Sequence, residues 1–269
     1  MRGINCAAVF LAVFSARSPA VVAARGPEEV EVQQIIEALR QSGVVARWQQ
    51  DEAGRRGLEI EFHFPDVTDE QLAPLERLRD VRSLLVRSRK LTDRGLAHIS
   101  GCSELQSLSL ECPQLSDRGL ETLKNFRELR VLRLEAATEG ACLKHLEGAG
   151  RLWSVSLISP RLNRDGIKNL SRLSGLTNLQ LIAPLDDAGV EELAALGELR
   201  GLSLNSPDLT NEHLAKLRPL TNLRTLHLAG TRVTDLKNLP SLNRLISLQC
   251  ENVPLTDAGL GGLKAIPFN

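Results

Sequence analysis

The chain reads LTDRGLAHISGCSELQSLSLECPQ from Leu91 to Gln114 and LSDRGLETLKNFRELRVLRLEAA from Leu115 to Ala137, two consecutive copies of one pattern. Nine related copies, 22 to 24 residues apart and the last of them truncated, begin at Val67, Leu91, Leu115, Thr138, Leu162, Leu185, Leu209, Val233 and Leu255. A fixed period of this size predicts a solenoid, because each unit buries its apolar face only against its neighbours. Catalysis is therefore not the first function to expect.

Each unit predicts one short helix and one short strand. It opens with Asp-x-Gly-Leu-x-x-Leu, whose apolar positions three apart suit a helix with one buried face. It closes with Leu-x-x-Leu-x-Leu, as at Leu105, Leu108 and Leu110, where alternation indicates a strand. Strands joined through helices run parallel with a right-handed crossover. We therefore predict an α/β fold: a right-handed horseshoe solenoid with a parallel concave sheet and convex helices, over residues 67–269.

The repeat pattern L-[ST]-D-x-G-L-x-x-L…L-x-x-L-x-L resembles leucine-rich repeats of the cysteine-containing, ribonuclease-inhibitor-like type. That family occurs in bacterial secreted proteins and in substrate-recognition subunits of ubiquitin ligases. The resemblance implies the solenoid fold and leaves the partner open. Gly140 and Arg164 depart from the pattern where Asp is expected. The eighth unit lacks two residues after Asp235, resembles the shorter bacterial-internalin repeat, and predicts a 3₁₀ turn.

The first residues, MRGINCAAVFLAVFSARSPAVVAA, have the order of a signal peptide. Arg2 precedes an apolar run over residues 6–16, and small residues lead to Ala24. We expect residues 1–24 to be a cleaved leader. An uncleaved anchor is the weaker alternative, because Arg17 interrupts a stretch that would need about 20 apolar residues to span a membrane.

Residues 25–66 differ in composition from the repeats. Pro27 and the two glutamates after it suit the start of a helix, and Gly43 suits its end. Two alternating runs, VVARWQQ and LEIEFHFP, then predict a hairpin. Since terminal units of a solenoid need a cover for their leucines, we predict a helix-hairpin cap. A separate binding module is the alternative.

The C-terminal end shows no comparable cap. The last repeat runs only to Asn269, so its helix has no strand after it. We expect Ile266, Pro267 and Phe268 to fold back over the exposed leucines, and the alternative is that another molecule covers them.

The charge balance favours neither nucleic acid nor a lipid surface as a partner. The formal net charge is +0, and removal of residues 1–24 leaves 31 basic and 33 acidic residues. Basic residues alternate with carboxylates on the expected helix faces, as at Arg118, Glu121 and Lys124, which indicates a solvated convex surface.

Thiols and imidazoles form no recognisable metal site. After the leader the cysteines are Cys102, Cys112, Cys142 and Cys250, with no Cys-x-x-Cys pair. We expect buried free thiols, with Cys112 and Cys250 pointing inward; disulfides are the alternative. The histidines are His63, His98, His145, His213 and His227. We expect His98 and His145 to be exposed on helices. We expect His227 to lie on the concave face, and the sequence pattern pairs no Ser or Cys nucleophile with it.

One column of polar residues recurs at the start of each expected helix. Its members are Asp69, Asp93, Asp117, Asp187, Asp235 and Asp257, with Asn211 in the same place. A file of oxygen ligands could bind calcium. We predict helix capping instead, because an Asp before a helix accepts from an unpaired backbone N–H, at about 0.5–2 kcal/mol each.

The concave face remains as the candidate binding surface. Its charged and apolar residues gather in the N-terminal half, and we predict a protein-binding site from Leu85, Arg87, Glu111, Val131, Arg133, Glu135, Ile158 and Ile182. Elsewhere the face is mainly Ser, Gln, Asn and Gly. The chain has no tyrosine, a residue common in tight interfaces, so a moderate affinity is expected. The alternative is that the charges neutralise one another and the isoleucines are incidental.

These features together predict a non-catalytic, monomeric protein-binding scaffold that is exported, with no cofactor. The alternative is an intracellular substrate-recognition subunit of a ubiquitin-ligase-like complex. The leader, and the lack of an F-box-like helical segment in the sequence, argue against that alternative. No constellation of residues supports an enzyme.

Overall fold

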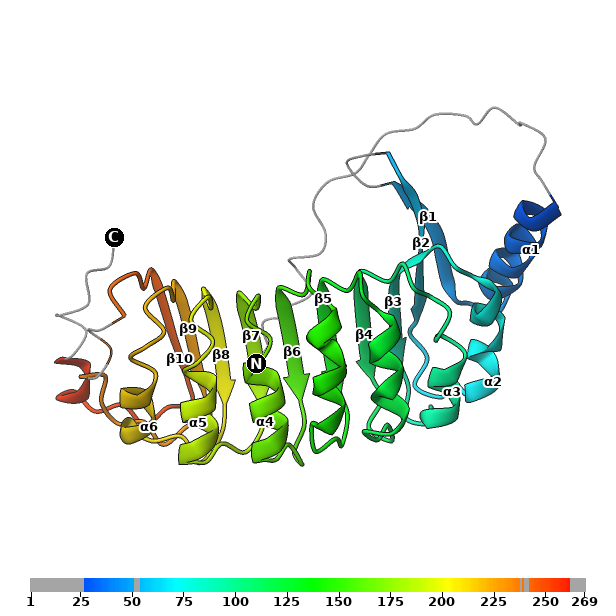
Figure 1. The fold of residues 1–269 in the computed structure, drawn as a ribbon. Coiled ribbons are helices and arrows are strands. Elements are labelled where there is room, and N and C mark those ends of the chain that lie inside the picture. The colour runs from blue at the N-terminus through cyan, green and yellow to red at the C-terminus, as the bar shows by residue number, and fades with distance from the viewer. Residues whose placement is uncertain (1–26, 51–53, 238, 240–241, 262–269) are drawn as a thin grey trace.

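The structure, a computed structural model, describes residues 27–50, 54–237, 239 and 242–261 (Figure 1). The strands are β1 Val45–Gln50, β2 Arg56–Phe62, β3 Val81–Arg87, β4 Ser107–Glu111, β5 Val131–Glu135, β6 Ser154–Ile158, β7 Asn178–Ile182, β8 Gly201–Asn205, β9 Thr225–Ala229 and β10 Ser247–Glu251. The α-helices are α1 Pro27–Gln41, α2 Asp69–Leu72, α3 Asp93–Ala97, α4 Arg164–Ser171, α5 Asp187–Leu193 and α6 Asn211–Lys216. The 3₁₀ helices are η2 Ala73–Arg77, η3 Gly119–Asn125 and η4 Ala141–Gly148.

All ten described strands form one sheet in sequence order. β1 and β2 are antiparallel and every later pair is parallel, with equivalent leucines aligned, as in Leu108 opposite Leu132. The helices lie in a row along one face of this sheet, and the other face is left open (Figure 1). The predicted α/β horseshoe solenoid is therefore confirmed. Two of the predicted helices, η3 and η4, are 3₁₀ in form.

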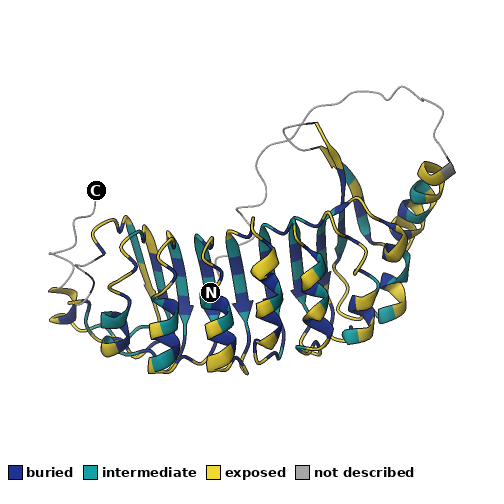
Figure 2. Ribbon diagram, in the orientation of Figure 1, coloured by how far each residue is buried: buried dark blue, intermediate teal, exposed yellow. Residues whose placement is uncertain are grey.

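The core is a continuous file of leucines between sheet and helices. Leu108 and Leu110 of β4 and Leu120 and Leu123 of η3 are each at most 2% exposed. Burial runs along the whole arc, and the yellow exposed residues gather on the outer surface of the helices (Figure 2). Each fully buried leucine contributes about 1.5–3 kcal/mol, so the repeated pattern supplies the stability.

The N-terminal cap is a helix and a hairpin, as predicted. α1 buries Ile36 and Leu39, and the chain turns at Gly43, whose φ of +82° suits glycine. β2 then joins β3 in parallel, so the cap continues the sheet. The predicted leader, residues 1–24, lies outside the described residues.

At the other end the strand β10 is less covered than its neighbours. Leu248 and Leu255 are only partly buried, and Leu260 is 42% exposed. Cys250, predicted to point into the core, is exposed. The position of β10 at the end of the sheet explains this exposure, because within the described residues no further strand pairs with it. The proposed fold-back of Ile266, Pro267 and Phe268 lies outside the described residues.

Two further points concern the turn of the eighth unit and helices that could span a membrane. The 3₁₀ turn expected in the eighth unit stays a prediction, because residues 238, 240 and 241 lie outside the described residues. Among the helices that the structure describes, none is long and apolar enough to cross a membrane.

Candidate functional site

The concave face carries three rows of side chains that run across the strands. Because parallel strands pair in register, equivalent residues of successive units lie about 4.8 Å apart. The first row is Ser83, Ser107, Val131, Ser154, Asn178, Gly201, Thr225 and Ser247. The middle row is Leu85, Ser109, Arg133, Ser156, Gln180, Ser203, His227 and Gln249, and the last row is Arg87, Glu111, Glu135, Ile158, Ile182, Asn205, Ala229 and Glu251.

Three of the predicted site residues form a chain of ion pairs. Arg87 Nε lies 2.5 Å from Glu111 Oε2, and Arg133 Nε lies 3.1 Å from Glu111 Oε1. The hydrogen bond from Arg87 lowers the pKa of Glu111, although partial burial opposes the shift. The same bond raises the pKa of Arg87. The carboxylate therefore stays ionised near neutral pH and holds both guanidinium groups in place.

Glu135 stands at the edge of this chain, beside the isoleucines. It follows Glu111 in the last row, and Ile158 and Ile182 come next. No ion pair of Glu135 is found within the described residues. Both isoleucines are half-buried. Among the described residues, the carboxylate of Glu135 thus has no ion-pair partner and lies next to two apolar side chains.

Leu85 and Val131 do not join that apolar pair. Leu85 lies in the middle row, two strands from Arg133, and Val131 lies in the first row next to Ser154. The expectation that Leu85 and Val131 stand beside the charged cluster holds, but the apolar residues form no single patch. The predicted set thus divides into a charged group and the Ile158–Ile182 pair, which meet at Glu135.

The C-terminal half of the face brings together a serine, a histidine and a glutamate. Ser203 Oγ lies 3.3 Å from His227 Nδ1, and His227 Nε2 lies 3.8 Å from Glu251 Oε2. The sequence alone indicated no nucleophile beside His227, but the strand register places Ser203 next to it. β8 and β9 each pair with a strand on both sides, so the backbone N–H groups beside Ser203 and His227 are engaged in the sheet and do not form an oxyanion hole. This arrangement is a polar surface cluster.

The Asp column plays a different role from the predicted one. Helix α3 begins at Asp93, and its N-cap is Thr92, whose side chain accepts from Arg94 N–H. Asp69 of the preceding unit accepts from Thr92, from N–H at 2.8 Å and from the hydroxyl at 2.6 Å. The capping prediction was therefore one residue out at Asp69 and Asp93, where Thr68 and Thr92 are the caps, whereas Asp235 does accept from the N–H of Lys237. Asp69 and Asp93 thus bond the next unit, and the Thr or Ser of that unit caps its own helix, whereas Asp186 takes the capping place before Asp187.

The bond between units recurs with variations along the arc. Asp93 accepts from Ser116 N–H at 2.9 Å, and Asp117 accepts from Glu139 N–H at 2.9 Å and from Cys142 N–H at 2.8 Å. Where Gly140 replaces the Asp, the backbone oxygen of Glu139 accepts from Asn163 N–H instead. These oxygens are occupied by N–H and O–H donors. Groups of three or more His, Cys, Asp or Glu suited to a metal ion are not found among the described residues.

Glycine in the Asp-x-Gly-Leu motif makes this contact sterically feasible. A Cβ at Gly95 would lie 2.5 Å from Asp69 Oδ1 and 3.2 Å from Asp69 Cα. A larger residue at Gly95 would displace the side chain of Asp69 or Leu91 and so disturb this contact. The motif is therefore one structural unit: the Asp, the hydroxyl residue and the glycine together set how closely coils stack.

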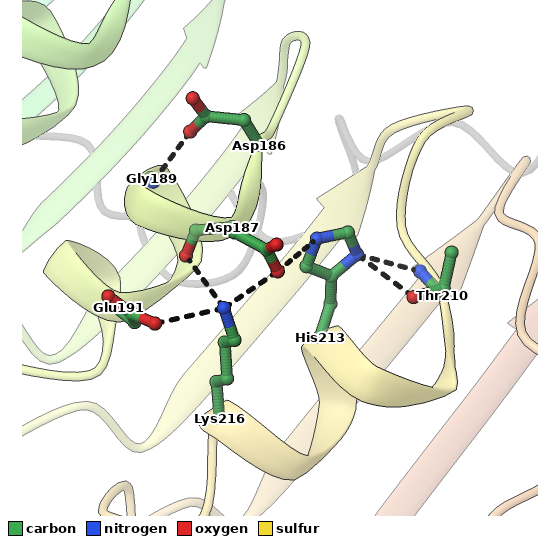
Figure 3. Close-up of polar contacts among 7 residues, drawn as sticks. All are labelled: Asp186, Asp187, Gly189, Glu191, Thr210, His213 and Lys216. Atoms are coloured by element: carbon green, nitrogen blue, oxygen red, sulfur yellow. Dashed lines mark hydrogen bonds and ion pairs between the residues drawn. The ribbon is translucent and has the colours of Figure 1, made fainter.

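His213 modifies the bond between units, and the sequence did not single it out for this (Figure 3). It is 8% exposed, and its Nδ1 accepts from Thr210 N–H at 3.0 Å. Its Nε2 lies 3.1 Å from Asp187 Oδ1, so the ring bridges the Asp and the cap residue. Lys216 bonds the same Asp187 oxygen and lowers the pKa of that carboxyl. The spacing Thr210-x-x-His213, that of a capping box, was the available signal.

The remaining histidines and cysteines have structural surroundings. His98 is only partly exposed because it pairs with Glu76 at 2.6 Å, which differs from the exposed position predicted. His145 is also half-buried. Cys102, Cys112 and Cys142 are buried, as predicted, and burial raises the pKa of each thiol to about 12. Protonated thiols of this kind are poor nucleophiles and poor metal ligands.

Comparisons with known proteins place this architecture in a structural class. No protein-family model and no curated protein matches the sequence. Solved structures do match. The internalin InlF of Listeria monocytogenes has a TM-score of 0.54 and 17% identity over 88% of this chain and 73% of its own. Internalin C2 of the same organism has a TM-score of 0.51 and 20% identity over 92% and 98%.

A plant receptor shows the same arrangement. The leucine-rich-repeat ectodomain of the Arabidopsis receptor kinase HAESA, solved in complex with an N-terminally extended IDA peptide hormone ligand, has a TM-score of 0.58 and 16% identity over 89% of this chain and 44% of its own. At such identities the likeness concerns the fold. The chain therefore has the fold of a leucine-rich-repeat solenoid, and the cysteine-containing subtype remains a resemblance of sequence.

Proposed function

We propose that this chain is a non-catalytic scaffold that binds another protein through the N-terminal half of its concave face. The observation that carries the proposal is the junction at Glu135. There a carboxylate without an ion-pair partner in the described residues adjoins the half-buried Ile158 and Ile182. A partner would place an apolar side chain on the isoleucines and a basic group at Glu135.

The ion-paired residues Arg87, Glu111 and Arg133 lie beside this junction and support the proposal of the same binding surface. Arg87, Glu111 and Arg133 are held by mutual bonds, so little side-chain entropy remains to be lost on binding. The complex of the HAESA ectodomain with a peptide hormone is a further support, because a peptide there meets a repeat solenoid of the same fold. We propose that the chain acts as a monomer and needs neither cofactor nor nucleic acid.

The test requires a partner obtained by affinity purification from the native host. The variant Arg133→Glu/Glu135→Arg/Ile158→Ser should weaken binding at least tenfold, about 1.4 kcal/mol. The double reversal leaves Arg87 next to Glu111 and introduces an arginine at position 135, opposite Glu111 on β5, so the fold should persist. A matched control is Arg118→Glu/Glu121→Arg on the exposed convex side. Unchanged affinity in the triple variant would move the site to the convex helices or to the C-terminal edge.

We further propose export, with residues 1–24 as leader, 25–66 as cap and 67–269 as repeats. The support is the order of charge, apolar run and small residues before Arg25. N-terminal sequencing of the protein from its native host should find a mature end near Arg25. An intact Met1 in a soluble cytosolic fraction would contradict export and favour the alternative of an intracellular recognition subunit.

A further inference from the structure

A second surface follows the edge of the sheet where strands β6 to β10 begin. Its members, each the residue before a strand, are Trp153, Thr177, Arg200, Arg224 and Ile246, here called the C-terminal rim. Their backbones form one hydrogen-bonded file: the N–H of Thr177, Arg200, Arg224 and Ile246 each donates to the carbonyl of the preceding member, at 2.7 to 2.9 Å. The rim is thus a fixed line across the sheet.

Large apolar side chains stand at both ends of this line. Trp153 is 45% exposed and Ile246 is 55% exposed, and they are two of the few large apolar residues that the described chain leaves in solvent. Tryptophan in particular is enriched at the energetic centres of protein interfaces. About half of each side chain is left in solvent, where a partner could cover it.

Two arginines without ionic partners lie between these ends. Arg200 and Arg224 are exposed, and neither takes part in an ion pair within the described residues. They immediately precede β8 and β9, which pair in register, and the N–H of Arg224 donates to the carbonyl of Arg200, so the two like charges lie on neighbouring backbones about one strand spacing apart, which is unfavourable. Arg151, by contrast, is neutralised by Glu128 at 2.9 Å. A bound anionic group would relieve the repulsion between Arg200 and Arg224.

The concave surface beside the rim, here called its floor, carries uncharged first-row residues. The first-row residues here are Ser154, Asn178, Gly201, Thr225 and Ser247. A Cβ at Gly201 would lie 2.5 Å from Asn178 Oδ1 and 3.1 Å from Thr225 Oγ1, so glycine keeps this floor low. The middle row over β6 to β10 adds no carboxylate either. An extended chain could lie on this floor, along the rim.

From these observations we infer that the C-terminal rim binds an extended acidic peptide segment of another protein. The rim crosses four strand intervals of about 4.8 Å, which matches about six extended residues at about 3.3 Å each. Carboxylates of the segment pair with Arg200 and Arg224, and apolar residues at its two ends rest on Trp153 and Ile246. Bidentate pairing of guanidinium with carboxylate supplies the specificity.

A peptide fits this rim better than a nucleic acid does. Nucleic-acid binding commonly neutralises about 6–10 phosphates, whereas the rim offers two unpaired arginines. The chain also has a formal net charge of +0, which provides no long-range attraction for a polyanion. This surface is separate from Glu135 and the Ile158–Ile182 pair, so it succeeds or fails independently of the function proposed above.

The test uses the full chain and a fluorescein-labelled synthetic peptide that alternates glutamate and serine between two terminal leucines. Fluorescence anisotropy should show binding, with the matched lysine peptide at least tenfold weaker. The variant Arg200→Glu/Arg224→Glu should lose at least tenfold in affinity, and Trp153→Ser should weaken binding without any change of charge. The control Arg94→Glu/Arg118→Glu alters two exposed arginines of the convex side, in equivalent positions of successive units, and should bind as the parent does.

Several results would overturn the inference. They are equal binding of the acidic and lysine peptides, no binding of the acidic peptide, an equal loss in the convex control, or tighter binding of a single-stranded RNA probe. An unchanged melting temperature establishes that the rim variants fold. Should the double reversal unfold the chain, Arg200→Ser/Arg224→Ser with the same expected loss takes its place.

Discussion

Single side chains join each coil to the next. Asp69 holds both the N–H and the hydroxyl of Thr92, while Thr92 in turn caps α3. A hydrogen bond to a charged group contributes about 1.5–3 kcal/mol. Since Gly95 must fit against the same carboxylate, coil spacing depends on all three residues.

The glycine of this motif should not tolerate a methyl group. We expect Gly95→Ala to lower the free energy of unfolding by about 1–3 kcal/mol, because its Cβ meets Asp69 Oδ1 and Leu91 Cδ1, each at 2.5 Å. Gly148→Ala is the matched control, since nothing lies within 4 Å of its Cβ. Urea titrations measure both. An equal stability of the two variants would show that the units can shift apart at little cost.

The stability contributed by Asp117 should depend on pH. Partial burial opposes ionisation, but bonds from Thr138, Cys142 and Glu139 outweigh it, and the pKa lies below the ordinary 3.8. A lowered folded-state pKa stabilises above the unfolded value, and this contribution is lost as the pH falls through the folded one. Asp117→Asn should therefore cost about 1 kcal/mol at pH 7 and progressively less as the pH falls below the ordinary pKa of 3.8 and through the lowered folded-state pKa. A difference independent of pH, or a melting temperature raised several degrees by millimolar calcium, would contradict this role.

At the scale of elements, the position of a strand in the stack decides what it buries. Cys112, which directly follows β4, is fully buried because the next coil covers it. Cys250, within β10, carries the same chemistry and is exposed. The interior strands are thus chemically protected, and the final described strand is not.

Thiol reactivity should report this difference. In the native protein at neutral pH, Cys250 should be alkylated first, although partial burial also raises its pKa. Cys102, Cys112 and Cys142 should stay unmodified, since each is buried and has a pKa near 12. Mass spectrometry of digested protein locates the label, and Cys250→Ser should abolish labelling within residues 27–261. Early labelling of Cys142 would reveal local opening of the arc.

At the scale of the whole molecule, stability is a sum of coils and interfaces between them. The cap belongs to that sum, because β2 pairs with β3 and Ile36, Leu39 and Ile60 are buried with the repeats. Each such side chain contributes about 1.5–3 kcal/mol, against about 5–15 kcal/mol for a typical domain.

Removal of the cap should therefore unfold or severely weaken the arc. We expect a chain beginning at Val67 to lose cooperative thermal unfolding, because the apolar side chains of β3 become exposed. Circular dichroism and calorimetry compare it with a chain beginning at Pro27, the start of α1. Equal melting temperatures, together with independent folding of residues 27–66, would establish the alternative of a separate module.

The amino-acid sequence alone determined the solenoid, its repeat period and the residues of the concave face. The reason is local: leucines that recur with period two and period three define strands and helix faces, and a repeat of 22 to 24 residues places equivalent residues side by side. The clustering of Arg87, Glu111 and Arg133 could be foreseen in this way, because it needs only strand register.

Tertiary structure alone decided which polar atoms meet between coils. The partners of Asp69, the bridge through His213, the approach of Ser203 to His227 and the exposure of Cys250 all depend on stacking across units. Hydrogen bonds form or fail over a few tenths of an ångström, whereas the sequence pattern gives positions only to within a residue. Burial of leucine tolerates an error of this size in position, because apolar contacts have no preferred direction. Hydrogen bonds do not tolerate it, because they depend on distance and angle.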